Sequence, residues 1–404
     1  MAKEENKLEE SAAYAQKGTS TEWYRGWDLT EAEREIFRKR SRESQLARIN
    51  ADKGLGPQSA HPIYQARLKP EDLMEKLEPN GFSCVSLFSG GGGLDLGFER
   101  AGFEHLASYD ILPFAGDTLR ANRPNWKIFA GSDGDVVSKK WTTMFSDVDV
   151  LHGGPPCQPF STAGNQLGEK DVRDMFPEFV RAVLEIKPRA FVAENVSAIA
   201  GKKFADYLDR MVLSPLGAEY KIITFKLEAA SFGVPQRRTR FFIVGFRDAS
   251  SFAKFSTPLP THVWGTSNQP QLFALSNLER TMGVREALGL PDIGSDDLAP
   301  TIRSALTGPR HTTSILSSTA AKRTWEQLQV WPNGVAASKA AANSFPAAKD
   351  HYRLSVPECA MLQGFPEDWT FVGATYQCLG LIGNSVAPPM AYHVGRSVAF
   401  ALSD

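Results

Sequence analysis

A cysteine between prolines has the surroundings that most clearly indicate chemistry. Cys157 lies in the segment GGPPCQPFS, directly after the apolar run VDVLHGG. The prolines restrict the backbone and would hold the thiol on a rigid turn above the end of a strand. A buried structural cysteine usually lies inside an apolar periodic element, whereas this position is the one expected of a nucleophile. We therefore interpret Cys157 as the candidate nucleophile.

Three charged side chains lie at the ends of two apolar runs that come after Cys157 in the sequence. The apolar run RAFVAEN ends with Glu194 and Asn195. A carboxyl group at the end of an apolar strand would be removed from water, which would raise its pKa. QRRTR leads into RFFIVGF, so the alternate side chains of Arg238 and Arg240 are predicted to share one face and to point at one spot. Each feature alone would more often be ordinary solvated charge. In combination with Cys157 they indicate a catalytic site.

A glycine-rich turn and a carboxylate indicate a cofactor site. The segment FSGGGGLD follows an apolar run, and a backbone without side chains can approach a dinucleotide, a phosphate or the amino-acid part of S-adenosylmethionine. The Lys-Ser/Thr of a P-loop is absent, and four consecutive glycines do not keep the usual dinucleotide spacing. Asp110, at the end of the next apolar run, could accept hydrogen bonds from the ribose of a nicotinamide or an adenosyl cofactor, or could cap a helix.

A second polar turn lies near the C-terminus. GNSVAPP precedes the helical run MAYHVGRSVAFAL, and an Asn384-Ser385 turn at a helix start would offer donors to a polar ligand. The alternative is an ordinary capped helix.

These residues require strands that end at one edge of a sheet. Between residues 83 and 247, short apolar runs alternate with helical patterns, which predicts an α/β fold with a doubly wound, mainly parallel sheet. In such a sheet ligands bind outside the carboxyl ends of the strands, near the switch in strand order. The expected site therefore lies at that edge.

The sequence predicts that the whole chain consists of four parts. Residues 1–80 form a polar, partly helical extension, 81–247 the catalytic domain, 248–350 a smaller Ser/Thr/Pro-rich domain, and 351–404 a return to the catalytic domain. From residue 299 to 349 there are six basic residues and one acidic residue, a net charge of +5. Such a stretch is either a solvated loop or a surface that faces a polyanion.

Composition restricts the class of protein but not the reaction. The 404 residues carry a net charge of −1, so no global field requires a nucleic-acid partner. Four widely spaced cysteines resemble neither a disulfide framework nor a zinc site, and no apolar run of about 18 residues occurs. We expect a cytoplasmic protein without a bound metal or a membrane anchor.

Taken in order, the motifs resemble those of the DNA cytosine-5 methyltransferases, including the restriction-modification enzymes. The matching segments are FSGGGGLDLGFERAG, GGPPCQPFS, ENV, QRRTR, LSVPECAMLQGFPEDW and GNSVAPPMA, within residues 83–247 and 352–404. The resemblance implies a class I, Rossmann-like methyltransferase that uses S-adenosylmethionine. Residues 248–350 occupy the place of the family's variable target-recognition domain.

The resemblance implies a role for each catalytic residue. Cys157 would add to C6 of a cytosine flipped out of the duplex, and Glu194 would bind the N3/N4 edge of the base. Arg240, with Arg238 beside it, would neutralise charge on O2. The expected cofactor contacts are Phe88, Gly90, Gly92, Asp110, Asp133, Pro156, Met175, Asn384 and Ser385, with Asp135 an alternative to Asp133 near the adenine.

Duplex DNA is the implied partner. Residues 158–172 would form a loop that closes over the target base. Expected DNA contacts are Gln158 and Ser161 in that loop and Arg303, Arg310 and Arg323 in the basic stretch, because arginine pairs with guanine edges or phosphates. We expect a monomer, in a restriction-modification system with a cognate endonuclease or as a solitary methylase.

Three other functions fit the sequence less well. The same chemistry on tRNA is one, but the insert of about a hundred residues favours duplex DNA. A non-catalytic DNA-binding module would not need Cys157, Glu194 and Arg240. A nicotinamide dehydrogenase would not need Cys157 and QRRTR together.

Overall fold

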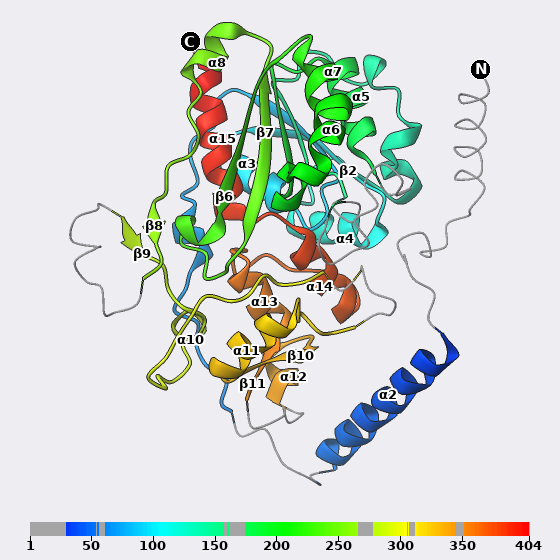
Figure 1. Ribbon diagram of the computed structural model, residues 1–404, viewed down its shortest axis with the longest axis vertical. Coiled ribbons are helices and arrows are strands. Elements are labelled where there is room, and N and C mark those ends of the chain that lie inside the picture. Colours follow the sequence, from blue (N-terminus) through cyan, green and yellow to red (C-terminus); the bar gives the residue numbers. More distant parts are fainter. Residues whose placement is uncertain are drawn as a thin grey trace.

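The central element of the fold is one twisted sheet (Figure 1). The computed structural model describes residues 30–53, 55, 61–156, 160, 174–265, 278–304, 306, 312–343 and 351–403. The seven strands run in the order β3-β2-β1-β4-β5-β7-β6. They are β1 (Ser83–Leu87), β2 (Glu104–Asp110), β3 (Ile128–Ala130), β4 (Val150–Gly153), β5 (Ala190–Val196), β6 (Lys221–Glu228) and β7 (Thr239–Phe246).

The sheet is mainly parallel, as predicted. Strands β1 to β5 pair in parallel, and only β7 runs antiparallel to its neighbours β5 and β6. Strand order reverses between β1 and β4, so the glycine-rich turn after β1 and the proline turn after β4 emerge side by side. This is the switch point at which doubly wound sheets bind ligands.

Helices cover both faces of the sheet because its strands are apolar on both sides. Val85 and Leu151 belong to one buried cluster, whereas their neighbours Cys84 and Val150 belong to the other. Helices α3 (Gly93–Arg100) and α15 (Pro388–Leu402) pack together on one face, and α5 (Phe176–Ile186), α6 (Ala205–Leu208) and α7 (Ser214–Gly217) cover the other. α4 (Pro113–Asn122) connects β2 to β3, and α8 (Ala249–Lys254) follows β7.

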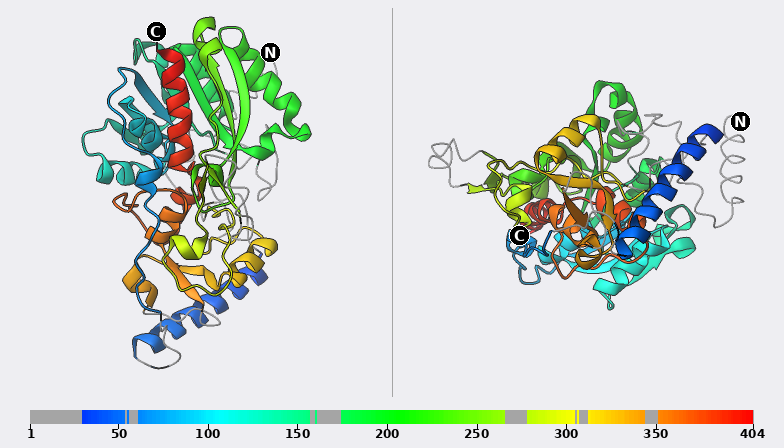
Figure 2. Two further views of the ribbon diagram at one scale, coloured as in Figure 1. Left: turned by 90° about the vertical axis from the view of Figure 1, so that its left-hand side faces the viewer. Right: turned by 90° about the horizontal axis from the view of Figure 1, so that it is seen from below.

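A smaller unit lies beyond the carboxyl edge of the parallel strands, below the sheet in Figure 1 and in the side view of Figure 2. Its strands β10 (Val330–Ala336) and β11 (Tyr352–Ser355) pair in parallel, beside α11 (Thr319–Gln327) and α12 (Lys339–Asn343). α10 (Val284–Ala287) and the short pair β8 (His262–Val263) and β9 (Glu279–Arg280) precede them. Helices α13 (Val356–Leu362) and α14 (Thr375–Asn384) then lead back to the sheet.

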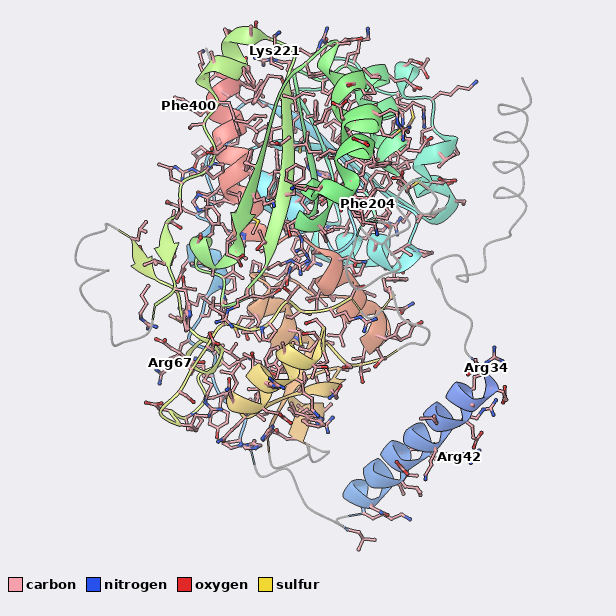
Figure 3. The ribbon with its side chains drawn as sticks, in the orientation of Figure 1. Arg34, Arg42, Arg67, Phe204, Lys221 and Phe400 are labelled. Carbon is pink, nitrogen blue, oxygen red and sulfur yellow. The ribbon has the colours of Figure 1, made fainter. Side chains whose placement is uncertain are left out.

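The opposite edge of the sheet faces away from the smaller unit. Lys221, the first residue of β6, and Phe400, near the end of α15, lie at the far end of the molecule (Figure 3). The smaller unit therefore lies at the carboxyl edge of the parallel strands.

The N-terminal extension contains the predicted helix, α2 (Glu31–Asp52), which stands apart from the sheet in Figure 1. All of its described side chains are exposed, those of Arg34 and Arg42 among them (Figure 3). Residues 61–80, in contrast, pack on the body of the protein, where Leu68 and Met74 are buried in the core. Among the described residues, no helix combines the length and the apolar character needed to cross a membrane.

Candidate active site

The glycine-rich turn is shaped for close approach to a ligand. Directly after β1, Phe88 and Gly90 have φ angles of +56° and +54°, and α3 begins at Gly93. The amide of Gly90 donates to Oδ2 of Asp110 at 2.7 Å, which fixes the turn against the end of β2. The glycine-rich turn and the carboxylate of Asp110 therefore lie next to each other and form one side of a candidate ligand site.

The side chain of Asp110 is a buried hydrogen-bond acceptor. Its second oxygen accepts from the amide of Leu112 at 2.8 Å, and the residue is only 9% exposed. Burial raises the pKa of Asp110 to about 6, although both backbone N–H donors favour the ionised form. A buried carboxylate that faces a cavity fits ligand hydroxyl groups such as those of a ribose.

Glu194 and Arg240 form a buried ion pair. Antiparallel pairing of β5 with β7 brings the two residues together, with 2.9 Å between Oε1 of Glu194 and Nε of Arg240. Both side chains are less than 10% exposed. Burial raises the pKa of Glu194, and the positive charges of Arg240 and Arg238 oppose that shift. The carboxyl group can thus hold a proton more readily than a solvated glutamate.

Arg238 does not point at the same spot as Arg240, contrary to the prediction. Its guanidinium is fully buried and donates to the carbonyls of Gly383 and Ser385, at 2.8 and 2.6 Å. Arg238 precedes the ladder of β7, which begins at Thr239, so the alternation expected of a regular strand does not apply. Arg238 therefore positions the C-terminal turn.

The proline turn is tied to β5. Nδ2 of Asn195 donates to the carbonyl of Pro155 at 2.9 Å, so the residue after Glu194 fixes the turn that precedes Cys157. Sequence reasoning assigned no role to Asn195, although its place in the ENV motif was a signal. Cys157, Gln158 and Ser161 lie outside the described residues, as does Arg310.

One cavity contains most of the predicted residues. It lies at the carboxyl ends of β1, β2, β4 and β5 and is bounded by α14. Its lining includes Phe88, Gly90, Asp110, Pro156, Met175, Asn384 and Ser385, together with Glu194 and Arg240.

Two predicted cofactor contacts are not among the lining residues. Asp133 is exposed, whereas Asp135, the alternative, lines the cavity. A Cβ atom on Gly92 would lie 2.7 Å from side-chain atoms of Leu119 and Trp369. Gly92 is therefore required by packing behind the turn.

The C-terminal turn differs from the sequence interpretation. Asn384 is the last residue of α14 and not the start of a helix, and α15 begins only at Pro388. The hydroxyl of Ser385 donates back to the carbonyl of Leu381 at 2.8 Å. Asn384 is exposed on the cavity rim, so its side-chain amide can reach a ligand.

The described basic residues of the insert occupy different positions. Arg303 is partly buried beside α14, whereas Arg323 is exposed on α11 of the smaller unit. These two arginines therefore do not form one cluster, and neither of them lines the cavity.

The residues present fit S-adenosylmethionine. The ligand has ribose hydroxyls that match Asp110 and a purine that matches the apolar surface around Phe88 and Val136. Phe88, Asp110, Asp135 and Asn384 are the side chains of the cavity that would hold it.

Comparison with known proteins agrees with this geometry. Residues 82–399 match the family model of the C-5 cytosine-specific DNA methylases. The Type II methyltransferase M.NgoMIV of Neisseria gonorrhoeae is 34% identical over 336 residues, which cover 80% of this chain and 98% of that protein. M.NaeI of Lentzea aerocolonigenes, another Type II methyltransferase, is 34% identical over 333 residues, 79% of this chain and 75% of its own length.

A solved structure shares the fold. A crystal structure described as a DNA modification methyltransferase encoded within a prophage of Escherichia coli aligns with a TM-score of 0.50 and 24% identity. The alignment covers 78% of this chain and 98% of that one.

The fold and the cavity define a doubly wound methyltransferase that uses S-adenosylmethionine. Within that class, the chain belongs to the C-5 cytosine-specific DNA methylase family and is a DNA cytosine-5-methyltransferase. The dehydrogenase hypothesis is therefore wrong.

Proposed function

We propose that this enzyme methylates a cytosine flipped out of duplex DNA, through a covalent bond between Cys157 and C6 of the base. The observation that carries the proposal is the buried pair Glu194–Arg240, which lines the same cavity as Asp110 and Pro156, the residue before Cys157. A stacked base exposes neither ring face to such a cavity, so the nucleotide has to leave the helix.

Each residue has a defined task in this mechanism. The thiolate of Cys157 forms a bond to C6, and the electron pair of the C5–C6 double bond moves toward C5. Glu194 donates its proton to N3 and accepts from the exocyclic amine, which its raised pKa favours. Arg240 stabilises negative charge on O2 while it orients Glu194.

The remaining steps restore the enzyme. Bound S-adenosylmethionine supplies a methyl group from its sulfonium, and C5 is the atom that becomes methylated. Loss of the C5 proton to a base then re-forms the C5–C6 double bond, the C6–S bond breaks, Cys157 leaves as a thiolate, and N3 returns its proton to Glu194. The turn fixed by Asn195 would keep the sulfur in place through both steps.

The wider role is part of the same proposal. The enzyme would act as a monomer on a short sequence, read by residues 248–350, between the catalytic parts 81–247 and 351–404. It would protect that sequence from a cognate restriction endonuclease, as the names of the Type II relatives suggest.

The test is methylation of plasmid DNA in vitro. Purified protein is incubated with S-adenosylmethionine and plasmid DNA of mixed sequence, and the product is analysed by bisulfite sequencing. Protection of one cytosine within one short motif is expected. Methyl transfer to tRNA but not to the plasmid would contradict the proposal.

Binding of the methyl donor should depend on pH through Asp110. The ionised carboxylate accepts hydrogen bonds from ribose hydroxyls, so affinity for S-adenosylhomocysteine should be constant above pH 7 and fall below about 6, the pKa of the buried group. Isothermal titration at pH 7.5 and pH 5.5 measures the change, which we expect to be about threefold to tenfold.

Two variants identify the responsible group. Asp110→Asn should bind weakly at both pH values, whereas Asp133→Asn, which alters an exposed carboxylate outside the cavity lining, should behave like the unmodified enzyme. An unchanged pH dependence in Asp110→Asn would assign the effect to another group.

A further inference from the structure

One stretch of the insert reaches the donor cavity. We call residues 297–304 together with Leu306 the strap. It leaves the smaller unit after α10 and crosses to α14. Its two ends contact different parts of the active site.

The first half of the strap is fastened to the QRRTR motif. The amide of Arg237 donates to the carbonyl of Ala299 at 2.8 Å, and its guanidinium pairs with Asp297 at 2.7 Å. The hydroxyl of Thr301 donates to the carbonyl of Arg237 at 2.6 Å. These contacts lie three residues before Arg240 and fix the strap to the catalytic unit.

The second half lies directly on α14. A Cβ atom on Gly383 would lie 2.4 Å from the amide nitrogen of Ser304, and one on Gly380 would lie 2.2 Å from Cγ of Leu306. The hydroxyl of Ser304 donates to the carbonyl of Gly380 at 3.3 Å. Two glycines one helical turn apart therefore create the groove that admits the strap.

Leu306 closes the cavity from this side. It is 5% exposed, packs with Phe114, Ala115 and Leu381, and lines the cavity that also contains Asp110. Phe114 and Ala115 follow Asp110 at the start of α4, on the ribose side of the cavity. The apolar wall near the donor thus includes one residue from the insert.

We propose that Leu306 is a donor-binding residue: the insert completes the S-adenosylmethionine cavity as well as facing DNA. The residue sets the affinity for the methyl donor through apolar contact and takes no part in bond making. The proposal does not depend on the covalent step at Cys157.

The experiment compares two truncations within the strap. Leu306→Ala is expected to weaken binding of S-adenosylhomocysteine about tenfold in isothermal titration without DNA, and to raise KM for S-adenosylmethionine by a similar factor. Its kcat at saturating donor and its KM for plasmid DNA should remain within twofold of the unmodified enzyme. Leu306→Met, which retains most of the apolar volume, should restore most of the affinity.

The matched control is Leu298→Ala. Leu298 is a leucine of the same strap with 3% exposure, but it is not among the residues that line the cavity. This variant should lower Tm and leave donor affinity within twofold. Equal weakening by both variants would reduce Leu306 to a general packing role, and a raised KM for DNA with unchanged donor affinity would place it at the DNA instead; either result overturns the proposal.

Discussion

Replacement of Cys157 by serine should abolish turnover and leave binding of DNA and methyl donor intact. An unassisted serine hydroxyl adds poorly to C6, because an alkoxide is far less accessible than a thiolate at neutral pH. We expect transfer of radiolabelled methyl groups to plasmid DNA to fall by a factor on the order of 10⁴ or more.

Covalent trapping separates the nucleophile from a structural cysteine. Duplex DNA that contains 5-fluorocytosine cannot lose a proton from C5, so the unmodified enzyme should remain attached to it on a denaturing gel, whereas Cys157→Ser should not. The control is Cys378→Ser, which changes a buried cysteine of α14 outside the cavity lining and should still form the adduct. Adduct formation by Cys157→Ser would refute the assignment.

Removal of the positive partner of Glu194 should affect both stability and rate. Arg240→Met leaves a carboxylate buried without its ion pair, which costs about 3–5 kcal/mol in the free energy of unfolding. Loss of charge stabilisation at O2 should lower kcat by a factor of about 10² to 10³. Urea unfolding at pH 7.5 and radiolabelled methyl transfer measure the two effects.

The pH dependence of this variant has a definite sign. Without Arg240, the pKa of Glu194 in the folded protein rises further above its unfolded value, so the folded state takes up a proton more readily. The stability deficit should therefore shrink as the pH is lowered and grow as the pH rises from the folded-state pKa of Glu194 in the unmodified enzyme toward its higher folded-state pKa in the variant. A deficit that is constant between pH 5 and pH 8 would contradict this explanation.

A double-mutant cycle isolates the pair. In Arg240→Met, the further change Glu194→Gln removes the stranded charge and should recover part of the lost stability, whereas Glu194→Gln alone should be milder than Arg240→Met. Additive effects would mean that the two side chains do not depend on each other.

The fold was predictable because its signals are local. Alternating apolar and helical patterns sufficed for the doubly wound sheet, and motifs at strand ends located Asp110, Glu194 and Arg240 at one edge. The carboxyl ends of parallel strands lie at the same edge of a sheet. Residues that follow successive parallel strands in the sequence therefore lie close together in space.

The errors concern groups whose role depends on distant contacts. Arg238 and Arg240 have the same residue type two positions apart, and only the carbonyls of Gly383 and Ser385 distinguish them. Asp133 and Asp135 are the same residue type two positions apart, and the path of the chain after β3 decides which one lines the cavity. Asn195 belongs to the ENV motif, but only its hydrogen bond to Pro155 shows what it does, and the contact of Leu306 with α14 has no signal in the sequence.

The position of α14 and α15 bears on biosynthesis. The last part of the chain supplies Asn384 and Ser385 to the cavity, and α15 covers α3 directly behind the glycine-rich turn. A polypeptide whose final helices are still being synthesised therefore has strands and nucleophile but no closed donor cavity. A chain that lacks α14 and α15 should therefore be unable to bind the methyl donor.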